Sequence, residues 1–328
     1  MFKRILAATD MPNQVDPVVL SAVQLAGHLD ASLYILHALE SSSTDNRRLV
    51  RHFSTGHEVV TTPAYEAMVK QEIKQTYADM LMEGIHYNIR VVSGFPWEEI
   101  LKLAREMKVD LVLMGPHSGR AVEKGVVRVA GKVGSTVEAV IQRERCPVMI
   151  VNFPVAQRKM DFKNILIPID FSRSCECAVC FSVRFAKKFL SKIIVFHMIP
   201  VLPFPKYSKA EFETDVRHAR RRIEIFCNDY LSGIEHAYMI RGGSLPHLEI
   251  LKCAEQQDVD AVVMGSHTKE EKGKWYAGSA VERVGYRSKN PVIVITDPEV
   301  LTPWKKRPSQ KIDEDKNDIR LIRVHNTE

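Results

Sequence analysis

Two glycine-containing connections are the parts of the chain best suited to hold a charged ligand. The later one begins with Gly265-Ser266-His267-Thr268 and reaches Gly278-Ser279-Ala280 after nine more residues. Glycine lets the backbone approach a ligand closely, and Ser279 is placed where a helix would begin. The N–H groups and partial positive charge of a helix N-terminus suit phosphate oxygens. The spacing predicts a phosphate site, but a strand end at Gly265 and a helix cap at Ser279 would explain the same residues.

The earlier connection has the same ends and a longer interior. It begins with Gly115-Pro116-His117-Ser118 and reaches Gly134-Ser135-Thr136 after fifteen more residues. Pro116 fixes its first step, because the proline ring restricts the backbone. Gly134 and the two hydroxyl residues after it can still receive a phosphate at a helix start. If only one connection binds a phosphate, we expect it to be the later one.

An acid and a histidine end apolar runs upstream of each connection. The acids are Asp10 and Asp170, and the histidines are His37 and His197. In an open parallel sheet, ligands bind beyond the carboxyl ends of the strands, where the strand order reverses. Asp170 can equally cap the helix that follows it, with Ser172 or Ser174 sharing that role. The histidines can equally be partly buried and hydrogen-bonded near a strand end, so both interpretations stay open.

Three of the six cysteines, Cys175, Cys177 and Cys180, lie within six residues and suggest a metal or redox site. At about 100° per residue on a helix, Cys177 and Cys180 are about 60° apart and Cys175 is on another face. Three ligands therefore cannot converge from one regular helix. Small buried cysteines are the simpler interpretation, with a zinc site shared with a histidine as the alternative. In the first helical turn, Cys175 is expected to be the most acidic and oxidisable of the three.

The chain lacks the sequence patterns of several other functions. The chain contains no Walker A lysine motif, nucleophile elbow or metalloprotease helix, so we predict no catalytic residues and no enzyme. The net charge of +6 is spread over 86 charged residues, and Arg220-Arg221-Arg222 is interpreted as a solvated helix face, so nucleic acid is not expected. No apolar run reaches the roughly 18 residues of a membrane span, and a signal peptide is not expected, because Asp10 interrupts the first apolar residues. We expect a cytoplasmic protein.

The segments that must position these residues occur twice, in the same order. The offset between the copies is 160, then 150, then 144, and it changes only between segments. A conserved order with a fixed offset in each segment indicates tandem duplication. The matching pairs are Phe2 to Asp10 with Phe162 to Asp170, Leu33 to His37 with Ile193 to His197, Val109 to His117 with Val259 to His267, and Gly134 to Glu138 with Gly278 to Glu282.

Each copy has the pattern of alternating strands and helices. Continuous apolar runs, typical of a sheet covered on both faces, predict first-copy strands over 5–8, 33–37, 110–114 and 148–151. Helices are predicted from Pro63 to near Gly84 and over 98–107, with counterparts from a capping box at Ser208 to near Gly233 and over 248–256. Such alternation gives parallel pairing through right-handed crossovers. Each copy is therefore predicted to be a five-stranded, doubly wound α/β domain.

These residues resemble the universal stress protein family in its two-copy form. The family's nucleotide-binding pattern is glycine, two residues, glycine, nine residues, glycine, then serine or threonine. Gly265, Gly278 and Ser279 keep that spacing, whereas Thr268 stands at the second glycine, where a β-branched residue is poorly suited to positive φ. The resemblance covers residues 1–153 and 160–298 and leaves out a charged tail at 299–328.

The resemblance implies a Rossmann-like, adenine nucleotide α-hydrolase-like fold in each copy. It also implies a stress-response regulator that binds ATP, with or without Mg²⁺, mainly through the second copy. In that copy the adenosine would face Asp170, Val195 and His197, and the ribose and phosphates would face Gly265, His267, Thr268, Gly278, Ser279 and Ala280. The first-copy counterparts are Asp10, Gly115, His117, Gly134, Ser135 and Thr136.

The family also suggests how the copies associate. Its members pair through the last strand of each domain, here 148–151 and 292–295, which predicts a pseudo-two-fold dimer within one chain. Such pairing would cover two apolar edges that are otherwise prone to aggregation. The two-copy chain is expected to be able to form a further homodimer and to act on an unknown protein partner. The alternatives are a non-nucleotide scaffold with degenerate sites, or a metal- or redox-responsive module built on the Cys175–Cys180 cluster.

Overall fold

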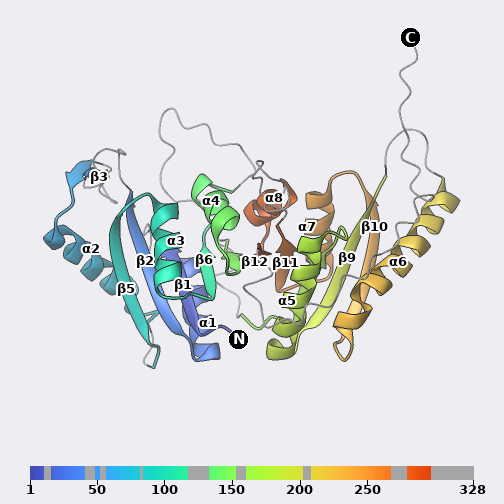
Figure 1. Cartoon of the computed structure of the whole chain (residues 1–328), viewed down its shortest axis with the longest axis horizontal. Coiled ribbons are helices and arrows are strands. Elements are labelled where there is room, and N and C mark those ends of the chain that lie inside the picture. The colour runs from blue at the N-terminus through green and yellow to red at the C-terminus, as the bar shows by residue number, and fades with distance from the viewer. Residues whose placement is uncertain are drawn as a thin grey trace, which may run out of the picture.

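Strands and helices alternate through both copies in the computed structural model (Figure 1). The structure describes residues 1–10, 16–40, 49–51, 57–81, 84–116, 133–152, 160–201, 208–266 and 279–296, so the tail predicted at 299–328 lies outside it. The first copy contains β1 (Arg4–Thr9), α1 (Pro17–Leu29), β2 (Ser32–Glu40), β3 (Leu49–Arg51), β4 (Glu58–Val60), α2 (Pro63–Thr76), β5 (Tyr87–Gly94), α3 (Pro96–Glu106), β6 (Leu111–Met114), α4 (Ser135–Arg143) and β7 (Val148–Ile150). The second contains β8 (Asn164–Pro168), α5 (Arg173–Phe189), β9 (Lys192–Pro200), α6 (Lys209–Leu231), β10 (His236–Gly243), α7 (Pro246–Gln256), β11 (Ala261–Gly265), α8 (Ser279–Arg287) and β12 (Val292–Ile295).

The two copies share one ten-stranded sheet, in the order β10-β9-β8-β11-β12-β7-β6-β1-β2-β5. All neighbours within a copy are parallel. The last strands, β7 and β12, pair antiparallel, with Met149 opposite Ile293. This confirms the doubly wound α/β fold and the predicted pairing of the last strands. Because β7 and β12 run in opposite directions, the carboxyl edges of the two copies face opposite ways at the centre of the sheet.

Helices cover both faces of the sheet, which explains the continuous apolar strands. Successive strand residues point to opposite faces, so Ile5 and Ala7 belong to the core on the face of α1, α2, α5 and α6, whereas Leu6 belongs to the core on the face of α3, α4, α7 and α8. Figure 1 shows α4 and α8 together above the centre of the sheet and α1 and α5 below it. Both faces therefore have cores that run from one copy into the other.

The junction between the copies has matching contacts from both sides. The Asn152 side chain donates to the carbonyl of Gly285, within α8, at 3.1 Å and to that of Ser288, just beyond α8, at 2.5 Å. Thr296, at the equivalent place after β12, donates to the carbonyl of Glu144 at 2.7 Å, just beyond α4. Positions 152 and 296, like 144 and 288, differ by the repeat offset of 144. These reciprocal contacts give the junction its pseudo-two-fold character.

Several repeated residues have local structural roles. The Asp110 carboxylate accepts the backbone N–H groups of Lys3 at 2.9 Å and Arg4 at 3.0 Å. Asp260, 150 residues later, accepts the N–H of Asn164 at 2.8 Å. Each aspartate thus holds the start of the first strand of its copy beside the fourth. This role alone explains the repeat at that position.

The structure departs from the predicted elements at two places in the first copy. The helix predicted to close near Gly84 ends at Thr76, and an additional antiparallel hairpin, β3 with β4, precedes it. Val50 of that hairpin is fully buried.

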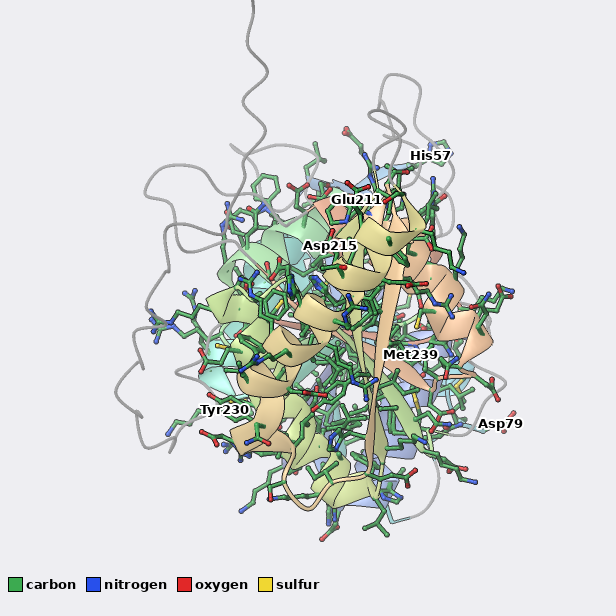
Figure 2. The ribbon with its side chains drawn as sticks, turned by 90° about the vertical axis from the view of Figure 1, so that its right-hand side faces the viewer. His57, Asp79, Glu211, Asp215, Tyr230 and Met239 are labelled. Carbon is green, nitrogen blue, oxygen red and sulfur yellow. The ribbon has the colours of Figure 1, made fainter. Side chains whose placement is uncertain are left out.

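In the second copy the capping box forms as predicted, because Ser208 and Glu211 hydrogen-bond each other's backbone N–H groups. Figure 2 shows α6 beside β10, with Glu211 near one end and Tyr230 near the other. No helix in the described ranges is long and apolar enough to cross a membrane.

Candidate functional site

The point where the strand order reverses in the second copy lies between β8 and β11. These strands are parallel neighbours, with Ala261 opposite Ile165. Asp170 follows β8 and Gly265 ends β11, so both lie at the carboxyl edge. The next helix, α8, begins at Ser279, and Ala280 in its first turn is half-buried. The topology therefore gathers Asp170, Gly265 and the start of α8 at one edge, while His267, Thr268 and Gly278 lie outside the described residues.

Gly265 is required by packing alone. A Cβ atom at this position would lie 2.2 Å from the carbonyl oxygen of Ser174 and 2.8 Å from the backbone nitrogen of Cys175. Real Cβ atoms do not come so close to backbone. The first turn of α5 thus rests directly on the end of β11. Glycine here allows a helix, rather than a ligand, to approach the strand.

Asp170 takes part in the N-terminus of α5. Ser172 is the N-cap residue, and its hydroxyl accepts the N–H of Cys175 at 3.3 Å. One oxygen of the Asp170 carboxylate accepts the N–H of Ser172 at 3.0 Å and the thiol of Cys175 at 2.9 Å. The capping role considered for this group of residues therefore belongs to Ser172, and Asp170 holds the backbone of that N-cap residue. The Asp170 side chain is nevertheless exposed at the carboxyl edge, where a ligand can reach it.

Cys175 lies in the first turn of α5, yet its thiol is not acidic. Burial raises its pKa to about 12, and the negative charge of Asp170 acts in the same direction. Burial and Glu176 likewise raise the pKa of Cys180 to about 12. Desolvation and a neighbouring carboxylate both disfavour a thiolate, and together they outweigh the helix N-terminus. Among the described residues no group of three or more histidine, cysteine, aspartate or glutamate side chains can hold a metal ion.

His197 belongs to an aromatic cluster on the α5–α6 face. Its Nδ1 lies 2.9 Å from the carbonyl oxygen of Ile169, as expected for a histidine near a strand end. Its ring centroid is 4.7 Å from that of Phe171, which has a left-handed backbone with φ of 67°. The guanidinium carbon of Arg222, from α6, lies 4.0 Å from the centroid of the Phe171 ring, and the Phe226 ring contacts the Phe171 ring edge-on. Burial lowers the pKa of His197, and the charge of Arg222 adds to the effect.

Sequence reasoning missed this cluster. The guanidinium of Arg222 covers Phe171. Arg220, Arg221 and Arg222 are all exposed, as predicted for a solvated helix face. Val195, predicted to face the adenosine, is fully buried in the core beneath α5 and α6. His197 lies two residues after Val195 on the same face of the strand and is only partly buried. The accessible part of this predicted subsite is therefore formed by Asp170 and His197.

The first copy closes the corresponding edge with a buried polar network. Asp16 is the N-cap of α1, and one oxygen of its carboxylate accepts the N–H of Val18 at 2.8 Å. Its other oxygen accepts the hydroxyls of Thr9 at 2.5 Å and Tyr77 at 2.9 Å, and those hydroxyls lie 2.8 Å apart. Burial and the charge of Asp16 raise the pKa of Tyr77. His37 adds Nδ1 at 3.0 Å from the carbonyl of Thr9, and Asp10 is half-buried beside the network.

The start of α4 also closes back on its own strand. Gly134 is the N-cap residue and has no side-chain cap hydrogen bond. Its N–H donates to the carbonyl of Pro116 at 2.8 Å, one residue beyond Gly115. Ser135 is exposed and Thr136 is half-buried, while His117 lies outside the described residues. The long connection thus brings its two ends into direct contact.

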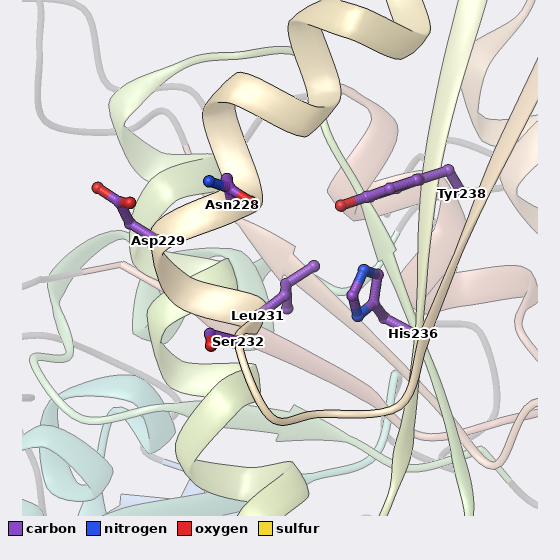
Figure 3. Close-up of a pocket in the computed structure, with 6 residues that line it drawn as sticks. All are labelled: Asn228, Asp229, Leu231, Ser232, His236 and Tyr238. Atoms are coloured by element: carbon purple, nitrogen blue, oxygen red, sulfur yellow. The ribbon is translucent and has the colours of Figure 1, made fainter.

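A pocket of about 330 Å³ lies elsewhere, between the end of α6 and the start of β10 (Figure 3). It opens at the amino end of β10, opposite the carboxyl edge. None of the predicted site residues lines it. Its lining residues are Asn228, Asp229, Leu231, Ser232, His236 and Tyr238.

The fold and this edge define a class: tandem, Rossmann-like α/β proteins whose strand order reverses once in each copy. The model of the universal stress protein family matches residues 1–152 and again residues 161–296. The chain belongs to the universal stress protein family.

Known relatives match about half of this chain and most of their own length. A universal stress protein of Methanocaldococcus jannaschii is 24% identical over 154 residues, 47% of this chain and 84% of its own. Universal stress protein A homolog 2 of Coxiella burnetii is 28% identical over 153 residues, 46% of this chain and 94% of its own. A crystal structure of a universal stress protein from Archaeoglobus fulgidus DSM 4304 covers 89% of this chain and 98% of its own, with a TM-score of 0.60 and 20% identity. That likeness supports the fold alone.

Proposed function

We propose that this protein is a cytoplasmic stress-response regulator that binds ATP or a related adenine nucleotide through its second copy. The observation that carries the proposal is the edge where β8 and β11 are neighbours and α8 begins at Ser279. The spacing from Gly265 to Gly278-Ser279 matches the family's nucleotide pattern. A phosphate at the start of α8 would be held by backbone N–H groups and the helix dipole.

The adenosine end of the ligand would lie across the end of β8. There Asp170 exposes its carboxylate, which can accept a hydrogen bond from a sugar hydroxyl or a base amino group. The ring of His197 beside it is partly buried, and burial keeps it neutral at pH 7 by lowering its pKa. Mg²⁺, where ATP carries it, would arrive on the phosphates, since no cluster of three metal-binding side chains occurs in the described ranges.

The first copy is the less suitable of the two. Its α4 N-cap, Gly134, already donates its N–H to Pro116, and its Asp16 carboxylate is used by the buried hydroxyls of Thr9 and Tyr77. The fifteen-residue interior of its connection also departs from the family spacing. We therefore assign nucleotide binding to the second copy.

Binding rather than fast catalysis is the proposed mode of action. At the second-copy edge, Cys175 has a pKa of about 12 and donates its thiol to Asp170, so it is not an activated nucleophile. Nδ1 of His197 is engaged with the carbonyl of Ile169. A bound nucleotide would instead change the surface of the connection between β11 and α8, which a protein partner would contact.

Calorimetric titration with ATP, ADP and AMP tests the proposal, using the native protein beside a Gly278→Asp variant. The carboxylate would occupy the start of α8 and repel phosphate, so affinity should fall at least tenfold. Matching far-UV spectra and melting curves would show that the variant is folded. Absence of binding by the native protein, or equal binding by both, would contradict the proposal.

A second candidate, a non-nucleotide interaction protein, is favoured by one pair of observations. Gly265 and Asp170 each have a structural role that needs no ligand: Gly265 admits α5, and Asp170 supports its N-terminus. If the native protein binds no nucleotide and the small molecules that co-purify with it include none, this candidate replaces the first.

A further inference from the structure

The pocket at the end of α6 has no part in the proposed function (Figure 3). It lies at the amino end of β10, whereas Asp170 lies at the carboxyl edge of the same parallel strands. Its volume of about 330 Å³ is at the lower end of the range for small-molecule sites. One wall is the last turn of α6, and the other is the start of β10. A small molecule here would not compete with a nucleotide at the carboxyl edge.

The wall formed by α6 is electronegative. The last carbonyl groups of a helix lack partners within it and carry a partial negative charge. The last turn of α6 contains no basic residue, and Asp229 in that turn is exposed. Asn228 and Ser232, which also line the pocket, add an amide oxygen and a hydroxyl that can accept hydrogen bonds. This wall therefore favours a cation.

The opposite wall is aromatic. The ring centroids of His236 and Tyr238 lie 5.2 Å apart, and Nδ1 of His236 lies 2.8 Å from the carbonyl oxygen of Ile234. Figure 3 shows the half-buried Tyr238 extending from β10 toward Asn228 of α6, across the space beside Leu231. The Leu231 side chain is only 1% exposed and forms an apolar floor. The face of a tyrosine ring attracts a cation, so this wall suits a cation that also carries carbon atoms.

The charged side chains near the pocket bring no lysine or arginine into it. Lys192 pairs with Glu235 at 3.0 Å, and Arg220 pairs with Glu224 at 3.1 Å. Among the described lining residues, His236 is the one basic side chain. A ligand cation would therefore reach the end of α6 without competition from a lysine or arginine of the pocket.

The first copy fills the equivalent place with its own residues. Tyr238 pairs with Val195, and Ile89 pairs with Ile35, which is the counterpart of Val195 at the offset of 160. Ile89 thus stands where the second copy has Tyr238, and it is only 4% exposed. The last turn of α2 also contains a basic residue, Lys74. Of these two places, the one in the second copy alone combines an aromatic wall with a helix end that lacks a basic residue.

We propose that this pocket binds a small alkylammonium ion. The ammonium group lies between the end of α6 and the ring of Tyr238, and its carbon atoms lie against Leu231. The helix end, the nearby charge of Asp229 and the face of the ring each stabilise the positive charge. This site is separate from the proposed nucleotide site and does not depend on it.

Titration of the full chain with n-butylammonium chloride, followed by the amide chemical shifts in NMR spectra, tests the site. The shift changes should concentrate at residues 228–238. The matched neutral ligand, n-butanol, should bind at least about fivefold more weakly, because it keeps the carbon chain and lacks the charge. Equal affinities for the two ligands, or no shift changes at these residues, would overturn the proposal.

Substitutions at Tyr238 separate the contribution of its ring from that of its hydroxyl. Tyr238→Phe keeps the aromatic face, so its affinity for n-butylammonium should stay within about twofold of native. Tyr238→Leu should bind about fivefold more weakly, since a cation–π contact contributes about that factor. Ile89→Leu, in the first copy, is the control and should bind as the native protein does. Unchanged affinity in Tyr238→Leu, or an equal loss in Tyr238→Phe, would contradict the assigned role of the ring.

A second variant decides the case where Tyr238→Leu does not fold, which melting curves would reveal. Asn228→Lys places a tethered ammonium group on the exposed last turn of α6, where a basic side chain is compatible with the helix. This group should compete for the pocket and weaken n-butylammonium binding at least about fivefold. Native affinity in a folded Asn228→Lys variant would overturn the proposal.

Discussion

The two carboxyl edges of this duplicated protein differ in how the first helix of each copy is capped and in the repeated aspartate, since Asp10 is half-buried and its counterpart Asp170 is exposed. In the first copy, Asp16 is buried and is shared by Thr9, Tyr77 and the first turn of α1. In the second copy, Asp170 is exposed, and the neighbouring space on the α5–α6 face is occupied by the rings of Phe171 and Phe226. A buried, fully used carboxylate stabilises the fold, whereas an exposed one is available to a ligand. The first edge is thus chiefly structural, and the second is the one to which we assign the ligand.

The largest contrast is expected in stability, from replacing the cap of each first helix. Asp16→Ala should lower the free energy of unfolding by about 4 kcal/mol, because it removes the N-cap and leaves two buried hydroxyls without their acceptor. Ser172→Ala should lower it by about 1 kcal/mol, the usual effect of losing a cap. Urea denaturation of both variants measures the difference. Equal losses would show that the polar network adds nothing to the cap.

A smaller loss is expected from a methyl group at the second edge. Gly265→Ala should destabilise the protein by about 3 kcal/mol, because its Cβ would overlap the backbone of Ser174 and force α5 away from β11. Gly27→Ala in α1 is the control, since its Cβ would meet only Ile85 at 3.8 Å and alanine favours a helix. Thermal melts of the two variants should shift in opposite directions. An unchanged melting temperature in Gly265→Ala would contradict the steric role assigned to this glycine.

The third contrast concerns the thiol at the second edge. Asp170→Asn removes the negative charge that helps to raise the pKa of Cys175 to about 12. The pKa should fall and alkylation at pH 8 should become about tenfold faster, since the thiolate is the reactive form. Cys227, whose pKa is raised to about 12 by burial alone, should react at an unchanged rate. Mass spectrometry of the alkylated peptides measures both sites, and an equal change at both would indicate general loosening.

The smallest effect is expected where α1 and α5 end. Asp30 and Leu190 occupy equivalent left-handed C-cap positions, with φ of 52° and 56°. Leucine tolerates this conformation poorly, and its side chain is 89% exposed, so Leu190→Gly should stabilise the protein by about 0.5–1 kcal/mol. Asp30→Gly should stabilise the protein less, since aspartate adopts the left-handed backbone conformation more readily than leucine does. Chemical denaturation of both variants would reveal whether the two positions differ in this way.

The sequence was sufficient for the fold because the duplication repeats its main signals. Apolar strands and the proline or serine residues at helix starts fix where elements begin, and the aspartates at 110 and 260 hold the same strand pair in each copy. The end of α2 was not predictable from Gly84. The chain leaves the helix at Tyr77, whose hydroxyl is held by Asp16, 61 residues away. That contact exists only after the chain has folded.

The site was predicted less completely, for a similar reason. Asp170 and Gly265 were placed at the correct edge, but their contacts with Ser172, Cys175 and Ser174 depend on how α5 packs against β11. Helical periodicity places Cys175 in a first turn, but it does not reveal the Asp170 carboxylate that accepts a hydrogen bond from the thiol. The groups missed altogether, such as Arg222 over Phe171, join different helices and strands. No local pattern contains such pairs.

The measurement that tests the central claim most directly is the stoichiometry of ATP binding in calorimetry, for the native chain, Gly278→Asp and the equivalent first-copy variant Gly134→Asp. The account predicts one ATP bound per native chain, one per Gly134→Asp chain, and at least a tenfold weaker affinity for Gly278→Asp. Two ATP molecules bound per native chain would contradict the account. So would weaker ATP binding by Gly134→Asp together with unchanged ATP binding by Gly278→Asp.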